Sequence, residues 1–132
     1  MFSGGIYDAK AHKVVTFYVV GKGLEPENAL TRGQAVIMAE RAAVADGHRQ
    51  LAEKVKGVYV DAYMKAGNGV ANYNTIHVHT QAWLRGSEII ELKQGQYNIT
   101  EARMRLRINF SKKGMVWWPV GVNTSNSKNV PI

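Results

Sequence analysis

Two histidines, His77 and His79, are the residues of this sequence best suited to metal binding, because imidazole nitrogens are common ligands of zinc and nickel. They stand two positions apart, which places both side chains on one side of a strand. Neither an HExxH pattern nor a nearby cluster of carboxylates completes a site around them. We therefore expect surface or hairpin histidines, no metal and no cofactor.

Two sets of charged residues could carry other chemistry. Three glutamates could provide a carboxylate pair for acid–base catalysis, and three arginines follow at alternate positions on one face of a predicted strand. The glutamates and the arginines can form ion pairs with each other across neighbouring strands. We therefore expect such ion pairs and not a pair of catalytic carboxylates. Pairing with acidic residues of a neighbouring subunit is the alternative. The residues concerned are Glu88, Glu91, Glu101, Arg103, Arg105 and Arg107.

The sequence of 132 residues is basic, with 17 Lys and Arg against 10 Asp and Glu and a net charge of +7. A positive surface favours anionic partners such as nucleic acid or an acidic polymer. The arginine face of the predicted strand has no aromatic residue on which a base could stack, so binding of nucleic acid is not expected and remains the competing hypothesis. No two of the 13 glycines stand three apart, which excludes GxxG and GxGxxG loops, and a GxSxG nucleophile motif is absent. We expect a protein without enzymatic activity.

The elements that would position these residues form an α+β domain. We expect an N-terminal arm over 1–11, a single domain over 12–110 and a C-terminal tail over 111–132 that makes an assembly contact. The domain should hold a mixed or antiparallel sheet of three to four strands with one long helix packed on a face, in the order β-α-β-(α)-β-β. The predicted elements are a strand at 12–21, a helix at 31–54, a strand at 58–63, a short helix or extended segment at 75–85, and a hairpin of 87–92 with 96–110.

Two apolar features are candidates for contacts between subunits. The strand at 12–21 is apolar on both faces, which is typical of a central strand or of one covered by a partner. Trp117 and Trp118 lie in the predicted tail, and tryptophan is enriched at interface hot spots. Folding of this tail back onto the core, or anchoring at a membrane interface, are alternatives. The interface candidates are Trp117, Trp118, Tyr18, Val20, Arg103, Arg105 and Arg107.

Two stretches carry a resemblance to a known family. They are AVIMAERAAVADGHRQLAEKVKGVYVDA at 35–62 and AWLRGSEIIELKQGQYNITEARMRLRI at 82–108. In composition and order they resemble the small bacterial outer-membrane lipoproteins that include the flagellar assembly lipoprotein FlgP. Members are exported, commonly lipidated at an N-terminal cysteine, and have no known enzymatic activity.

The resemblance implies a structural subunit that polymerises into rings or disks around the flagellar motor and supports motility. It implies the periplasmic face of the outer membrane or the flagellar basal body as location, with copies of itself and other motor proteins as partners. An envelope adaptor that binds an acidic polymer or a motor protein is the alternative to such a structural subunit. This sequence contains no cysteine, and its first residues lack the apolar run of a signal peptide. Either those signals lie upstream of it, or this member is not lipidated.

Overall fold

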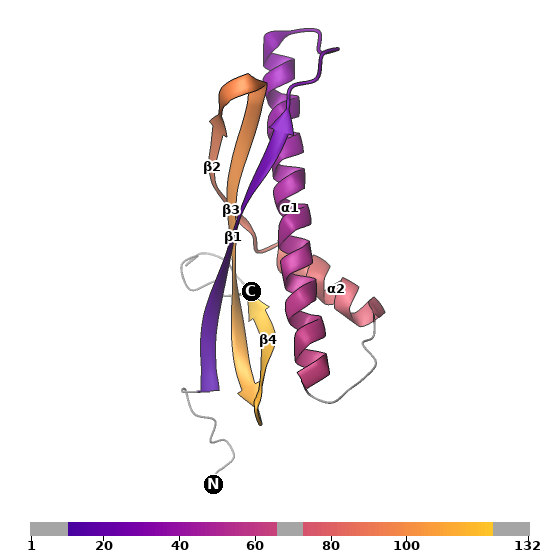
Figure 1. Ribbon diagram of the computed structural model, residues 1–132, viewed down its shortest axis with the longest axis vertical. Helices are drawn as coiled ribbons and strands as arrows, with labels where there is room; N and C mark the ends of the chain where they lie inside the picture. Colours follow the sequence, from indigo (N-terminus) through magenta and orange to yellow (C-terminus); the bar gives the residue numbers. More distant parts are fainter. Residues whose placement is uncertain (1–10, 66–72, 123–132) are drawn as a thin grey trace. The chain divides into compact units, whose positions relative to one another are not determined.

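The computed structural model describes residues 11–65 and 73–122 of the chain. It has the expected α+β class, with the long helix packed on a four-stranded antiparallel sheet (Figure 1). The strand order is β1-β3-β2, and β4 also pairs with β3. The elements are β1 (His12–Leu24), α1 (Arg32–Lys65), α2 (Tyr73–Leu84), β2 (Glu88–Gln94), the short helix η3 (Gln96–Asn98), β3 (Ile99–Lys113) and β4 (Val116–Val122).

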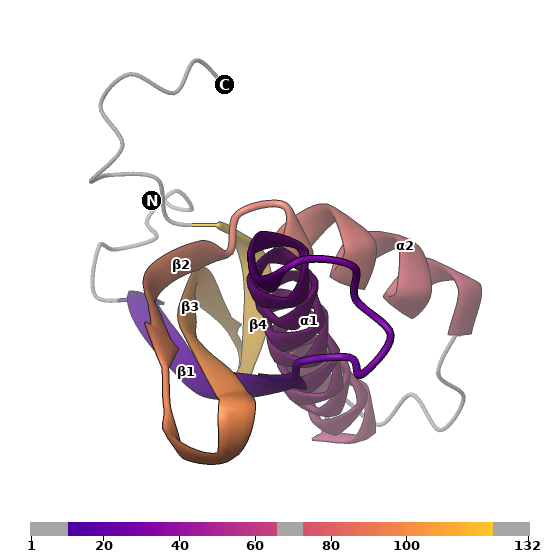
Figure 2. The same ribbon diagram turned by 90° about the horizontal axis from the view of Figure 1, so that it is seen from above.

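The chain forms two compact units, and β1, α1 and β3 contribute residues to both. The first unit consists of Met1–Thr16, Val55–Gly86 and Arg107–Ile132, and the second consists of Phe17–Lys54 and Ser87–Leu106. In the second unit, the strands lie on one side of α1 (Figure 2). The predicted arm lies outside the described residues except for Ala11.

Helix α1 is longer than the sequence predicts. Its start is as expected, since the Thr31 side chain accepts a hydrogen bond from the Gln34 N–H at 3.0 Å and so caps the first turn. The strand predicted over 58–63 is wrong, because α1 continues through Gly57 to Lys65. Tyr59 and Ala62 are buried at helical spacing after Val55. This packing overrides the preference of the valines and tyrosines there for strands.

Strand β3 confirms the strict alternation in its sequence. Every second side chain is buried, and the residues between them are half-buried or exposed. The predicted hairpin is also confirmed, with β2 and β3 antiparallel and Leu92 opposite Ala102. The core side chains that β3 contributes are Ala102, Met104, Leu106, Ile108 and Phe110.

The tail predicted from residue 111 is wrong in its first part. Strand β3 continues to Lys113, and residues 116–122 form β4, which pairs with β3 in the register Ser111 to Trp118. Gly114 and Pro119 interrupt the strand period of this stretch of sequence, since glycine and proline are uncommon inside strands. Gly114 makes the turn with a positive φ of 62°. Residues 123–132 lie outside the described part of the chain.

In the second unit, β1 and α1 meet backbone to backbone. A Cβ on Gly21 would overlap the Ala43 carbonyl oxygen and the Gly47 nitrogen, and a Cβ on Gly47 would overlap the Met104 sulfur. Gly47 therefore lies in close contact with both β1 and Met104 of β3. Small residues at these positions let the helix lie directly on the strand.

Helix α1 also covers part of one edge of β1. The Gln50 side chain donates a hydrogen bond to the Val20 carbonyl at 2.9 Å, and the Lys22 N–H donates to the Asp46 carboxylate at 2.9 Å. These are main-chain groups that would otherwise be open to another strand. Addition of a further strand at this stretch of β1 is therefore blocked.

The Asp46 carboxylate makes this contact sensitive to pH. The hydrogen bond from the Lys22 backbone, followed by that from Arg49, lowers the pKa of Asp46 below 3.8. A lowered folded-state pKa stabilises the fold above the unfolded value, and this stabilisation is lost as pH falls through the folded value. In urea titrations below about pH 4, the free energy of unfolding of Asp46→Asn should therefore fall less steeply with falling pH than that of the parent. Asp61→Asn, which removes an exposed ion pair with Lys65, is the control. If it reduced the pH dependence of the free energy of unfolding as much as Asp46→Asn does, that dependence could not be assigned to Asp46.

The β2–β3 connection holds a tyrosine in a strained conformation. Tyr97 and Asn98 both have positive φ, 60° and 59°, and Tyr97 is 83% exposed. Asparagine tolerates this region far better than a bulky aromatic residue does. Tyr97→Asn should raise the free energy of unfolding by about 1 kcal/mol. Tyr97→Phe keeps the strain and should change little in the same denaturant titration; equal stabilities for the two variants would contradict this account.

Candidate assembly surface

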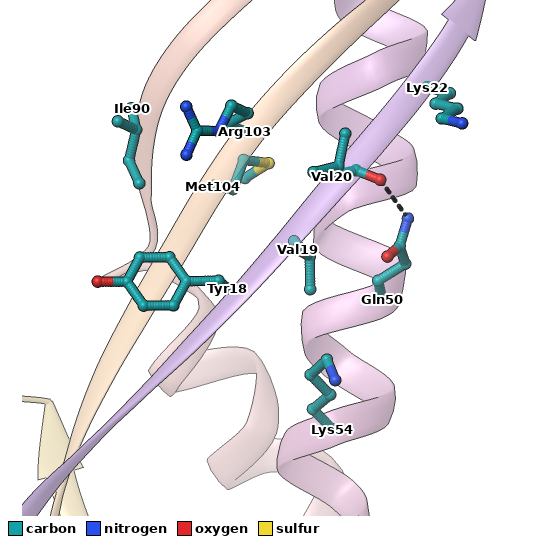
Figure 3. Close-up of a pocket in the computed structure, with 9 residues that line it drawn as sticks. All are labelled: Tyr18, Val19, Val20, Lys22, Gln50, Lys54, Ile90, Arg103 and Met104. Carbon is teal, nitrogen blue, oxygen red and sulfur yellow. Dashed lines mark hydrogen bonds between the residues drawn. The ribbon is translucent and has the colours of Figure 1, made fainter.

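The face of the second unit's sheet that points away from α1, here called the outer face, carries exposed apolar side chains. Tyr18 is 61% exposed, Val20 40% and Ile90 43%. The first two come from β1 and the third from β2, and Figure 3 shows Tyr18 on the same side of β1 as Ile90 and Arg103. A cavity of about 500 Å³ adjoins this face and extends past β1 to Gln50 and Lys54 of α1. Exposed apolar residues grouped in this way are typical of interaction surfaces.

Two arginines of the outer face are paired with glutamates of the neighbouring strand. Arg103 contacts the Glu91 carboxylate at 3.3 Å, and Arg105 contacts that of Glu88 at 2.8 Å. The hydrogen bond to Glu88 raises the pKa of Arg105. The predicted cross-strand ion pairs are thus confirmed for these arginines. Because neighbouring carboxylates compensate their charge, the two arginines are poorly placed to follow a phosphate backbone.

A bulge brings Ile90 into this surface. The β2–β3 register shifts between Ile89 and Glu91, so β2 has one extra residue there. Ile90 is not among the interface candidates predicted from the sequence. Two adjacent isoleucines in a strand that otherwise alternates are a signal from which a bulge can be inferred.

The other interface candidates lie in the first unit. Trp117 is half-buried under the Lys13 ammonium, which lies 4.3 Å from the ring centroid. Trp118 packs edge-on against Tyr63, with ring centroids 5.2 Å apart. Arg107 is half-buried on β3. The tryptophans therefore belong to a strand and not to an exposed tail, and their part in assembly stays a prediction.

The two histidines lie on helix α2, where a separation of two positions directs their side chains to different sides. His79 is hydrogen-bonded through Nδ1 to the Tyr59 hydroxyl. Burial, with a smaller effect of Tyr63, raises the pKa of Tyr59. Residues 11–65 and 73–122 contain no group of three or more His, Asp or Glu side chains that could hold a metal. The expectation of no metal stays a prediction.

A second apolar groove lies in the second unit between α1 and the edge strand β2. It has a volume of about 490 Å³ and combines apolar side chains with polar ones at its rim. His48 of α1 is hydrogen-bonded to Ser87 at 3.1 Å and so fixes the start of β2 beside the helix. The groove is lined by Ile37, Glu40, Arg41, Val44, Ala45, His48 and Leu92.

No helix in the described part of the chain is both long and apolar enough to span a bilayer. Comparison of the sequence with protein-family models gave no matching model, and comparison with curated proteins gave no match.

Proposed function

We propose that this chain is a non-enzymatic structural subunit of a bacterial cell-envelope assembly, and that it acts by associating with copies of itself. The observation that carries the proposal is the outer face, where Tyr18, Val20 and Ile90 remain exposed. Burial of a large apolar side chain stabilises a complex by about 1.5–3 kcal/mol. Association would bury these side chains, which remain exposed to solvent in the second unit.

The composition of the outer face supports a protein partner over nucleic acid. Tyrosine and arginine are enriched at protein interfaces. The nearby arginines, Arg103 and Arg105, already pair with Glu91 and Glu88. A nucleic-acid surface needs basic side chains whose charge is available to phosphate.

The location and the larger assembly follow from the resemblance stated above. Within this proposal, the subunits build a ring or disk at the outer membrane around the flagellar motor. Other motor proteins are further partners, and the outer membrane is one if a lipidated cysteine precedes this sequence. A ring requires contacts between two different patches of each subunit.

The double variant Tyr18→Ser with Ile90→Ser tests the proposal. If each side chain contributes about 1.4 kcal/mol, self-association should weaken about 100-fold. Light scattering after size-exclusion chromatography measures it, and thermal unfolding by circular dichroism checks the fold. Val78→Ser, at a residue of α2 that is 62% exposed, is the matched control. If the double variant is folded and associates as strongly as the parent, the outer face is not the surface through which the copies associate.

A further inference from the structure

We infer that two copies of this chain pair through the free edge of β2, antiparallel and about a two-fold axis at Leu92. The inference rests on the proposed function, since it names a surface through which the copies meet. Strand β2 ends the strand order β1-β3-β2, and no strand in the described part of the chain pairs with its second edge. Such an edge offers unpaired main-chain N–H and C=O groups to another strand.

The other end of that strand order is protected. On β1, the Val20 carbonyl accepts a hydrogen bond from the Gln50 side chain, and the Lys22 N–H donates one to the Asp46 carboxylate. A protected edge at β1 and an open edge at β2 point to β2 as the place where another strand can add in the second unit. The apolar groove beside β2 would receive a side chain from the added strand.

The sequence of β2 selects a second copy in one register. In a two-fold antiparallel pair, the residue on the axis faces itself, and its two neighbours face each other. An axis at Glu91 brings two carboxylates together, and an axis at Lys93 brings two ammonium groups together. An axis at Leu92 places Glu91 opposite the partner's Lys93 twice, and Leu92 against itself. Opposite charges stabilise such a pair and like charges destabilise it.

Leu92 has the position that this pairing needs. It lies opposite Ala102 on the side of the sheet that faces α1, lines the groove and is 41% exposed. Glu91 and Lys93 lie opposite Arg103 and Glu101, on the other side of the sheet. The pairing therefore covers an apolar side chain on one side and forms ion pairs on the other. A two-fold contact closes on itself, so larger assemblies need a second surface, such as the outer face.

Charge reversal with mixing tests the register. Glu91→Lys alone places lysines opposite Lys93, and Lys93→Glu alone places glutamates opposite Glu91, so each variant should dimerise about 10-fold more weakly. A mixture of the two variants restores both pairs between unlike chains and should regain the parent's affinity. Asp61→Lys, at an exposed residue of α1, is the control for net charge. Sedimentation velocity of each variant and of the 1:1 mixture provides the measurement.

A cysteine at the axis tests the geometry separately. The chain has no cysteine, so Leu92→Cys introduces a single thiol. Opposite Cα atoms in an antiparallel pair lie about 4.5–5.5 Å apart, within the range that a disulfide spans. Mild oxidation should give a covalent dimer of Leu92→Cys, and little dimer of Val78→Cys.

The outcomes separate this inference from the proposed function. Restored affinity in the mixture together with the Leu92→Cys dimer supports the β2 pair. A parent that associates, with no recovery on mixing and no cross-link, overturns the β2 pair and leaves self-assembly standing. A parent that stays monomeric overturns both.

Discussion

Replacing Gly21 by alanine should lower the free energy of unfolding by about 3 kcal/mol, because the new methyl group has no space. A Cβ at this position meets the Ala43 carbonyl oxygen and the Gly47 nitrogen. Both are main-chain atoms of α1, which cannot rotate away as a side chain can. Denaturant titration measures the loss, and a shift of the β1 signals in NMR spectra would show where it arises.

Gly57→Ala is the matched control for this variant. Gly57 lies in the interior of α1, and nothing lies within 4 Å of the position where its Cβ would stand. Alanine is favoured over glycine in a helix interior by about 1 kcal/mol, so this variant should be more stable than the parent. If both variants were stabilising, β1 and α1 would not be in main-chain contact.

Leu51→Ala should cost about 2–5 kcal/mol, the range found when a buried leucine is truncated. The Leu51 side chain is fully buried, at 0% exposure, on the face of α1 that packs in the core. The same substitution at Leu30, which is 88% exposed, should stay within about 0.5 kcal/mol. Equal effects of the two substitutions in denaturant titrations would contradict the assigned helix face.

Local patterns predicted the parts of the fold that have a clear period. The alternation in β3 follows from a repeat of 2.0 residues, and the helix predicted at 31–54 follows from a repeat of 3.6 residues. The stretch Val58–Tyr63 has strand-forming residues and follows a glycine, so local preference favoured a strand. The stretch is nevertheless helical, with Tyr59 and Ala62 buried and the Tyr59 ring stacked on Trp83, which is distant in sequence. Non-local packing of this kind is not readable from a window of residues.

The candidate surface was predictable only in part. Tyr18 and Val20 follow from the doubly apolar strand, and the pairing of Arg103 and Arg105 follows from the charges. Ile90 depends on a bulge, and the groove beside Leu92 depends on how α1 lies over β2. Both are consequences of register and packing. The strand that holds the tryptophans was not predicted, because Pro119 and Gly121 obscure its alternation.

Sedimentation equilibrium over a wide range of protein concentration shows whether the unmodified chain associates with itself. The weight-average mass should rise above the 14.6 kDa of one chain as concentration increases. The rise should pass through about twice that mass if the β2 pair forms first. A mass that stays at 14.6 kDa up to millimolar concentration would show that the chain does not associate with itself.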